Sequence, residues 1–338
     1  MSIPYRARSF MKRIGIFLLV LAILATTVLL FWFVWLDRYI VYTREGLVLD
    51  FDKPAHNLPG QTVHPPVIEN PITIHYHDGS ESPGGKKELT QISGYYISKE
   101  ELENDLPAVL EQVKKIPAGS AVMLDVKSIY GTFFYSSTVS DSRNTDIDTE
   151  AMDSLIKQLC SGDYYVIAQI PAMRDRLYGL DHVPDGLPVS AGYLWMDDDG
   201  CYWLNPKRSG TITYWTQIIN ELRSLGFDEV VLSYFYFPEA DSIVYQDDKQ
   251  AALEYASQTL VNNCATDKFT VSFCAETFFE APTGRCRIYM GNVAAADAQE
   301  KAGQYSLEKP EAQILFLTDN HDTRYDAYSV LRPLSTLD

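Results

Sequence analysis

Apolar residues from residue 90 onward form short continuous runs, which alternate with segments whose apolar positions recur every three or four residues. The runs have the length and composition of buried strands, and the segments between them have the period of amphipathic helices. Repeated strand–helix units of this kind predict an α/β fold in which helices cover a parallel sheet. The predicted strands cover residues 91–98, 120–128, 164–170, 228–237, 269–275, 286–290 and 312–318.

The helix predicted over residues 210–225 shows its pattern most clearly, with Ile218 and Leu222 on one face and Gly226 as its stop. Seven strands separated by such helices favour a (β/α)8-type TIM barrel over an open doubly wound sheet, because no G-x-G-x-x-G motif follows the first strand. The eighth strand is less obvious. Either the last residues or residues 71–76 close the barrel, or the barrel is incomplete.

Residues 14–36 show a different pattern, with 23 consecutive positions that carry no charge. As a helix this run exceeds the roughly 30 Å thickness of a bilayer's hydrocarbon core. Four basic residues precede it, which predicts a cytoplasmic N-terminus. A cleaved signal peptide is the alternative, but its apolar core is shorter and ends in small residues, whereas this run ends in FWFVWLDRY. We expect a single-pass anchor in the cell membrane.

The chain is thus predicted to have four parts. A basic cytoplasmic segment (1–13) precedes the transmembrane anchor (14–36). A stalk rich in Pro, Gly and polar residues (37–89), with one candidate strand at 72–76, leads to the barrel (90–338). The barrel is expected to be extracellular.

Charge is divided unevenly between these parts. Residues 1–44 hold six Lys/Arg and one Asp, so the whole-chain charge of −17 leaves −22 for residues 45–338. A domain this acidic is repelled by phosphate backbones, which argues against nucleic acid as a partner. The five cysteines show no zinc-ligand spacing, and we predict neither a metal site nor a cofactor. The sequence is compatible both with disulfide bonds and with free cysteines packed in the core.

The chemistry of a barrel of this kind lies at the carboxyl ends of its strands. Several carboxylates converge there, as glycoside hydrolysis requires, since it uses one carboxyl group as proton donor and a second as nucleophile or base. Aromatic side chains beside them offer faces on which sugar rings stack, although such side chains also pack beneath long loops. The candidate residues are Asp125, Lys127, Arg174, Trp203, Ser233, Tyr234, Tyr236, Glu276, His321 and Asp322.

Four segments of the chain, AVMLDVKSIYGTFFY, YYVIAQIPAMRDRL, YWLNP and LGFDEVVLSYFYFP, resemble in order and spacing the putative glycosyl hydrolase domain family, whose barrels are similar to the alpha-amylase clan. The resemblance covers residues 90–240 well. Asp125 and Lys127 reproduce the family's Asp-x-Lys after the second strand. By position, the resemblance implies that Glu276 is the proton donor and Asp322 an auxiliary carboxylate, with Asp125, Glu239 or Asp241 available to activate water in an inverting mechanism.

Three positions depart from the family pattern. Gln169 stands where the third strand usually carries Arg, and Ser233 and Tyr236 replace an Asp and an Arg on the fourth strand. The fourth-strand Asp is the expected nucleophile, and a serine without a nearby base does not replace it. No G-x-S-x-G motif surrounds Ser233, which argues against a Ser-His-Asp hydrolase.

Structural roles are also open for the charged candidates. Asp125 and Lys127 could form an ion pair, Glu276 could cap a helix, and residues 319–322 could form a turn with Asx hydrogen bonds. The sequence therefore predicts a glycoside hydrolase acting on an extracellular or cell-envelope carbohydrate. The alternative is a catalytically inactive barrel at the cell surface that binds carbohydrate or holds a protein partner, without catalysis.

Overall fold

The computed structural model describes residues 23–28, 40–43, 46–49, 88–140, 142, 144, 146–190 and 192–337. In the N-terminal unit, β1 (Ile40–Thr43) and β2 (Gly46–Leu49) form an antiparallel hairpin within the segment predicted as a stalk. The strand predicted at 72–76 lies outside the described residues. Of the predicted membrane span only 23–28 are described, as an exposed helical segment. Nowhere in these described ranges is a helix both long and apolar enough to cross a membrane.

Eight parallel strands close into a barrel in the second unit, which confirms the predicted TIM barrel. The last residues of the chain supply the eighth strand, because β10 pairs with both the first and the preceding strand of the barrel and so closes it. The strands are β3 (Ser93–Ile97), β4 (Ala121–Asp125), β5 (Tyr165–Pro171), β6 (Glu229–Ser233), β7 (Thr270–Cys274), β8 (Ile288–Gly291), β9 (Ile314–Leu317) and β10 (Ser329–Pro333).

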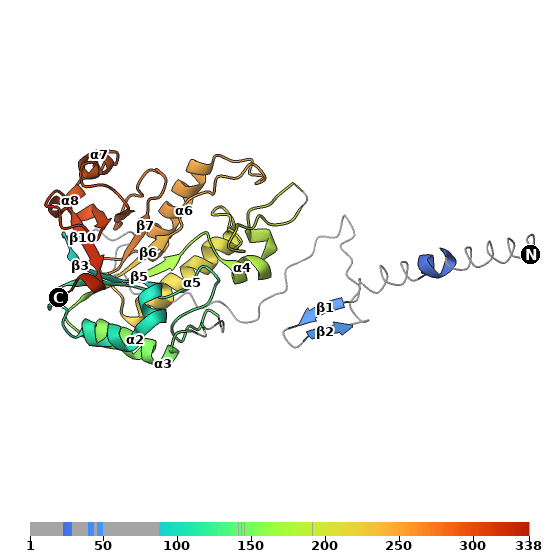
Figure 1. Ribbon diagram of the computed structural model, residues 1–338. Coiled ribbons are helices and arrows are strands. Elements are labelled where there is room, and N and C mark those ends of the chain that lie inside the picture. The colour runs from blue at the N-terminus through green and yellow to red at the C-terminus, as the bar shows by residue number, and fades with distance from the viewer. Residues whose placement is uncertain are drawn as a thin grey trace, which may run out of the picture. The chain divides into compact units, whose positions relative to one another are not determined.

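Helices surround these strands (Figure 1). In α5 the side chains of Ile218 and Leu222 are buried as predicted, and Gly226 ends the helix with a φ of 98°. The helix α7 before the last two strands is short and begins only at Ala298. The helices are α2 (Lys99–Val113), α3 (Thr149–Ser161), α4 (Arg176–Asp181), α5 (Ser209–Leu225), α6 (Lys249–Cys264), α7 (Ala298–Gly303) and α8 (Pro310–Gln313), with 3-10 turns η2 (Val183–Asp185), η3 (Tyr325–Ala327) and η4 (Leu334–Thr336).

Alternate residues of each strand divide between two apolar clusters. Val122 and Leu124 belong to the layer between strands and helices, whereas Ala121 and Met123 belong to a smaller cluster inside the barrel. Because side chains in a strand alternate with a period of two, Asp125 continues the inward-facing row of Ala121 and Met123. The same alternation puts the last inward positions of neighbouring strands at the carboxyl end of the barrel.

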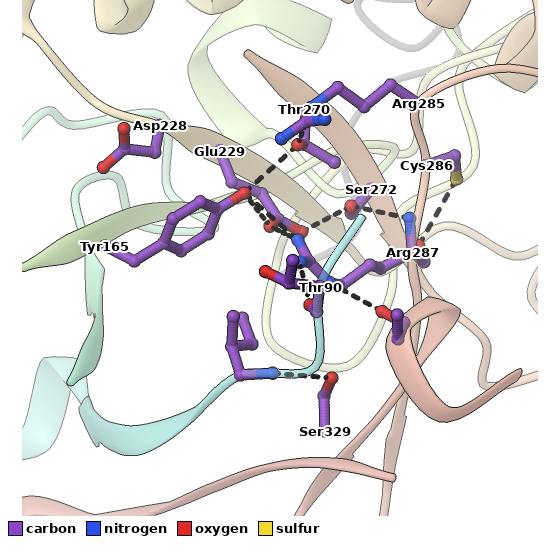
Figure 2. A network of polar contacts seen from close by, with 12 residues as sticks. Thr90, Tyr165, Asp228, Glu229, Thr270, Ser272, Arg285, Cys286, Arg287 and Ser329 are labelled. Atoms are coloured by element: carbon purple, nitrogen blue, oxygen red, sulfur yellow. Dashed lines mark hydrogen bonds and ion pairs between the residues drawn. The ribbon is translucent and has the colours of Figure 1, made fainter. Parts of the chain in front are cut away.

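A polar network fills the opposite end of the barrel (Figure 2). Glu229, at the start of β6, forms a buried ion pair with Arg287 just before β8. The hydroxyl groups of Tyr165 and Tyr289 donate to Glu229, each over 2.9 Å, and Ser272 donates over 2.5 Å. The guanidinium of Arg287 balances the charge of Glu229, and the hydroxyl donors occupy its lone pairs. The carboxylate can therefore lie inside the barrel. This end is a structural core.

Candidate active site

The mouth of the barrel, formed by the carboxyl ends of the strands, is hollowed into adjoining cavities. One of about 460 Å³ reaches Asp125 and Ser233, and another of about 590 Å³ reaches Glu276. Both cavities are bordered by the same four residues, so the two carboxyl groups flank a shared wall. These shared residues are Tyr234, Gly291, Asn292 and Leu317.

Backbone strain occurs at this same wall. Tyr234 has a φ of 50° and Asn292 a φ of 56°, and they are the only residues other than glycine with positive φ that the structure reports in the described chain. Left-handed conformations cost energy for residues with a side chain, and they cluster where a fold positions functional groups. The turn at Tyr234 also corrects the strand predicted over 228–237, since β6 ends at Ser233.

Asp125 lies at the end of β4, opposite Gln169 of β5 in the strand register. One carboxylate oxygen accepts a 2.6 Å hydrogen bond from the Gln169 amide, and the other accepts a 2.8 Å bond from the Lys99 backbone N–H. Burial raises the pKa of Asp125 to about 6, although both hydrogen bonds act to lower it; the charge of Glu100 adds to the rise. Asp125 therefore carries a proton at higher pH than an ordinary aspartate.

Lys127 forms its ion pair with Asp175. Its Nζ lies 2.6 Å from Oδ2 of Asp175, and both side chains are fully buried. Tyr214 donates a 2.9 Å hydrogen bond to the same carboxylate, which also caps α4 through the Tyr178 N–H. The sequence suggested an ion pair between Asp125 and Lys127, but Lys127 pairs with Asp175 instead. The carboxylate of Asp175 balances the buried charge of Lys127.

Ser233 ends β6 at the position where the family resemblance expects an acid. Its side chain is buried, and its hydroxyl donates to the carbonyl oxygen of Ile170 over 3.2 Å. The hydroxyl proton is therefore bonded to backbone rather than to a side-chain base. This contact gives Ser233 no means of activation as a nucleophile.

Glu276 follows β7 and has an exposed side chain. Partial burial of the carboxyl group raises the pKa of Glu276. Hydrogen bonding to the Tyr236 side chain and the Tyr234 backbone and the charge of Arg174 act to lower it. Burial raises the pKa of Tyr236 to about 12, and the charge of Glu276 adds to the rise. The charges of Glu276 and Asp125 both act on the Cys274 thiol at the end of β7, where they raise its pKa in addition to the larger effect of burial.

Arg174 and Trp203 pack into the wall rather than into a cavity. The Arg174 guanidinium binds Asp197 over 2.6 Å, also binds Asp199, and lies 5.3 Å from the centre of the Tyr234 ring. Trp203 is only 3% exposed and donates a 2.8 Å hydrogen bond to Asp197. Its ring offers too little free surface to stack on a sugar.

Asp322 and His321 lie in the loop after β9. Both oxygens of Asp322 accept from Arg324, which lowers the pKa of Asp322 to about 2. The Asp322 N–H donates to the Asn320 side chain, so this loop contains the Asx hydrogen bonds suggested by its composition. The mouth cavity beside Tyr96 is bordered by Asp319 and Asn320 of this loop.

Other features of the mouth were not anticipated from the sequence. Tyr130 borders the Asp125 cavity and Phe278 the Glu276 cavity, and their side chains are 40% and 47% exposed. Their position after a strand end was the only signal in the sequence. All five cysteines are free thiols. In the ranges that the structure describes, no three His, Cys, Asp or Glu side chains gather to hold a metal ion.

Solved structures similar to this chain include several glycosidases. A hypothetical protein from Ruminiclostridium thermocellum ATCC 27405 is 17% identical, with a TM-score of 0.45, over 53% of this chain and 96% of that one. The GH36 alpha-galactosidase AgaA of Geobacillus stearothermophilus is 12% identical, with a TM-score of 0.48, over 74% of this chain and 40% of that one. A GH31 sulfoquinovosidase from E. rectale is 12% identical, with a TM-score of 0.41, over 59% and 32%.

This chain spans less than half the length of these two glycosidases, and likeness at such identity concerns the fold alone. No curated protein matches the chain. One family model matches residues 94–278, a segment that includes Asp125 and Glu276 and ends before Asp322. Since that match covers more than half of its residues, the chain belongs to the family described as "Putative glycosyl hydrolase domain".

Proposed function

We propose that the protein is a glycoside hydrolase whose two catalytic carboxyl groups are Asp125 and Glu276. The observation that carries this proposal is the pKa of Asp125, which burial raises to about 6 at the mouth of the barrel. A carboxyl group with a pKa of about 6 can serve as the acid while a second carboxyl group across the same wall serves as nucleophile or base.

Asp125 is assigned as the proton donor, which reverses the role that the resemblance implied for Glu276. Asp125 gives its proton to the glycosidic oxygen while the bond between that oxygen and the anomeric carbon breaks. Glu276, as carboxylate, either bonds to the anomeric carbon or takes a proton from the water that attacks it. The separation of the two carboxyl groups when sugar is bound decides between these outcomes.

Two aromatic rings that the sequence did not single out have supporting roles in this proposal. Tyr130 and Phe278 supply exposed rings beside the two carboxyl groups, where sugar faces could stack. Asp322 is assigned no role as acid or base in this proposal, because both its oxygens accept from Arg324. The substrate is proposed to be an extracellular or cell-envelope carbohydrate.

The cellular location is proposed from the sequence. Residues 14–36 anchor the chain in the cell membrane as a single span, and the barrel faces outward. The acidity of the outer part keeps anionic polymers at a distance. Protease added to intact cells is expected to remove the barrel while leaving the basic N-terminus protected; protection of the barrel would refute this topology.

The activity is tested with the full chain in detergent, by measuring reducing sugar released from a panel of cell-wall and dietary polysaccharides. Asp125→Asn and Glu276→Gln are each expected to lower the rate at least a hundredfold. Asp319→Asn is the matched control, since this acid borders the mouth without being assigned a chemical role. Full activity in Asp125→Asn would refute the proposal.

A second candidate function is a carbohydrate-binding or protein-holding barrel without catalysis. It is favoured by Ser233, whose hydroxyl is bonded to the Ile170 carbonyl where the resemblance expects a nucleophile. Isothermal titration separates the candidates. Wild-type protein that binds a glycan but never cleaves it supports the inactive barrel, whereas protein that binds no glycan refutes both carbohydrate functions and leaves the protein-holding role.

A further inference from the structure

The two cavities at the mouth adjoin each other and are large. The cavity that reaches Asp125 has a volume of about 460 Å³, and the one that reaches Glu276 has a volume of about 590 Å³. Each alone falls within the roughly 300–1,000 Å³ that encloses a small ligand. Because the cavities share a wall, the mouth has room for a carbohydrate longer than a single sugar unit.

Each cavity has an exposed aromatic ring at its border. Tyr130, 40% exposed, borders the Asp125 cavity, and Phe278, 47% exposed, borders the Glu276 cavity. Tyr130 follows β4 and Phe278 follows β7, and in the closed barrel β5 and β6 separate these strands on one side and β8, β9, β10 and β3 on the other. The two rings therefore stand on nearly opposite sides of the mouth, each beside its own cavity.

Tyr130 lies at the tip of a tight turn that Ser128 and Thr132 close. The Ser128 N–H donates to the Thr132 carbonyl oxygen over 2.9 Å, and the Ser128 hydroxyl accepts from the Tyr130 N–H over 3.2 Å. Gly131 has a φ of 87°, and a Cβ atom there would lie 2.5 Å from Oδ1 of Asp175, so the turn requires glycine. The backbone of Tyr130 is thus fixed while its ring stays exposed.

Phe278 is held in place by its neighbours. Its ring lies 5.1 Å from the ring of Tyr305, which is buried. The next residue, Phe279, is fully buried and packs against the rings of Phe235 at 5.4 Å and Phe273 at 6.0 Å. Phe279 therefore anchors the loop to the core, and Phe278 rests on Tyr305 with part of its ring exposed.

We propose that Tyr130 and Phe278 are stacking platforms on the two sides of the cleavage point, so that the mouth binds an interior stretch of a polysaccharide chain and cleaves it within the chain. Sugar rings present C–H faces that pack on aromatic faces, and a ring fixed in advance binds with less loss of side-chain entropy. This inference rests on the proposed function of Asp125 and Glu276.

Cleavage within a chain follows from platforms on both sides. An enzyme that removes terminal sugars needs a pocket that is blocked at one end, whereas here an exposed ring lies beside each carboxyl group's cavity. Hydrolysis adds the hydroxyl group of water to the anomeric carbon and a proton to the departing oxygen, and it leaves two shorter chains. Each of these chains then contacts one of the two rings.

The test measures binding by isothermal titration of the full chain in detergent, with Asp125→Asn as the background because this variant is expected to bind without cleaving. The probes are the disaccharides and hexasaccharides of cellulose, xylan, starch and chitin. A hexasaccharide that reaches both cavities is expected to bind about tenfold or more tightly than its disaccharide, and Tyr130→Ala and Phe278→Ala are each expected to lower its affinity about tenfold.

Matched variants separate the platforms from exposed rings in general. Tyr130→Phe and Phe278→Tyr keep a ring at each position and are expected to bind the hexasaccharide as their parent does. Tyr255, 53% exposed on α6, borders neither mouth cavity, so Tyr255→Ala is expected to change nothing. Equal affinities for disaccharide and hexasaccharide, unchanged hexasaccharide binding in both alanine variants, or binding of none of these glycans would each overturn the inference.

The products of the wild-type protein distinguish failure of this inference from failure of the proposed function. Release of mixed oligosaccharides with a rapid fall in viscosity is expected. Release of single terminal sugars alone keeps the proposed function and overturns the inference. Full activity in Asp125→Asn instead overturns the proposed function, whereas length-dependent binding that needs both rings still supports a mouth that binds a chain.

Discussion

The side-chain amide of Gln169 donates a 2.6 Å hydrogen bond to Oδ1 of Asp125, across the pair of strands β4 and β5. The family resemblance expects an arginine at this position. A guanidinium would hold the carboxyl group ionised, but a neutral amide leaves burial as the dominant effect on its pKa. With Gln169 rather than an arginine beside it, Asp125 keeps the raised pKa that burial gives it.

The first prediction concerns Gln169→Arg. The introduced guanidinium is expected to lower the pKa of Asp125 from about 6 by roughly one to three units. Because the protonated form of Asp125 is the proposed donor, the alkaline limb of the kcat/KM profile moves to lower pH, and activity at pH 6 falls. Steady-state rates between pH 4 and 8 measure the shift.

Gln169→Met is the opposite control. It removes a hydrogen bond that acts to lower the pKa of Asp125 and adds no charge, so the alkaline limb is expected to move to higher pH. If both variants keep the wild-type limb, Asp125 is not the group that donates the proton.

A second prediction concerns Glu221 of α5, which holds the loop after β4. Its carboxylate accepts from the hydroxyl groups of Tyr135 over 2.7 Å and Ser137 over 2.6 Å, and from the backbone and side chain of Thr138. Burial acts to raise the pKa of Glu221, but these hydrogen bonds outweigh it and lower the pKa. The ionised carboxylate thus stabilises the folded state.

The sign follows from the lowered pKa. This stabilisation is fully present above the ordinary pKa near 4.5 and is lost as pH falls through the lower folded-state value. Glu221→Gln is expected to cost roughly 1–3 kcal/mol at pH 7, because donors in the loop lose their acceptor. Urea unfolding at pH 7 and pH 3 measures the difference in the free energy of unfolding between variant and wild type. A difference that is larger at pH 3 than at pH 7 would contradict the stabilising role of the ionised Glu221 carboxylate.

Much of the site was predictable because strand periodicity is simple. Alternation along the strand that ends at Asp125, and the order of the strands, suffice to put Asp125 and Ser233 on inward positions at the mouth. Periodicity does not predict in which direction a long side chain extends. Lys127 lies two residues beyond Asp125, yet it reaches Asp175 on the next strand's loop.

Sequence patterns do not predict which aromatic side chains are exposed. Trp203 and Phe278 both follow polar or acidic stretches near strand ends, yet one is 3% and the other 47% exposed. The difference depends on which loop covers which ring. Trp203 is covered because Arg174, Asp197 and two tyrosines converge on it from distant segments, and such convergence is not visible in a local pattern.

A third prediction concerns Gly94 in β3. A Cβ atom added there would lie 1.8 Å from the carbonyl oxygen of Ala121, its partner in β4. Backbone atoms cannot yield as the end of a flexible side chain does, so Gly94→Ala is expected to cost about 3 kcal/mol or more in the free energy of unfolding. Gly303→Ala, where nothing lies within 4 Å, is expected to change it by less than about 1 kcal/mol. Equal effects in urea unfolding would refute the steric explanation.

The last prediction concerns the polar network at the end of the barrel opposite the mouth, where Arg287 and Glu229 form a buried ion pair (Figure 2). Arg287→Met leaves the charge of Glu229 inside the barrel without a cation. Breaking a buried pair in this way costs about 3–5 kcal/mol. Chemical unfolding at pH 7 measures the loss, and an exposed pair supplies the control: Lys207→Met is expected to cost about 1 kcal/mol or less.

A double variant separates lost charge from lost packing. Glu229→Gln removes the buried charge that Arg287→Met leaves without its partner, so adding it is expected to recover part of the lost stability. Urea unfolding at pH 7 measures the single and the double variant. If the double variant is no more stable than Arg287→Met, the loss comes from packing of the arginine stem, and the ion pair is not what stabilises this end of the barrel.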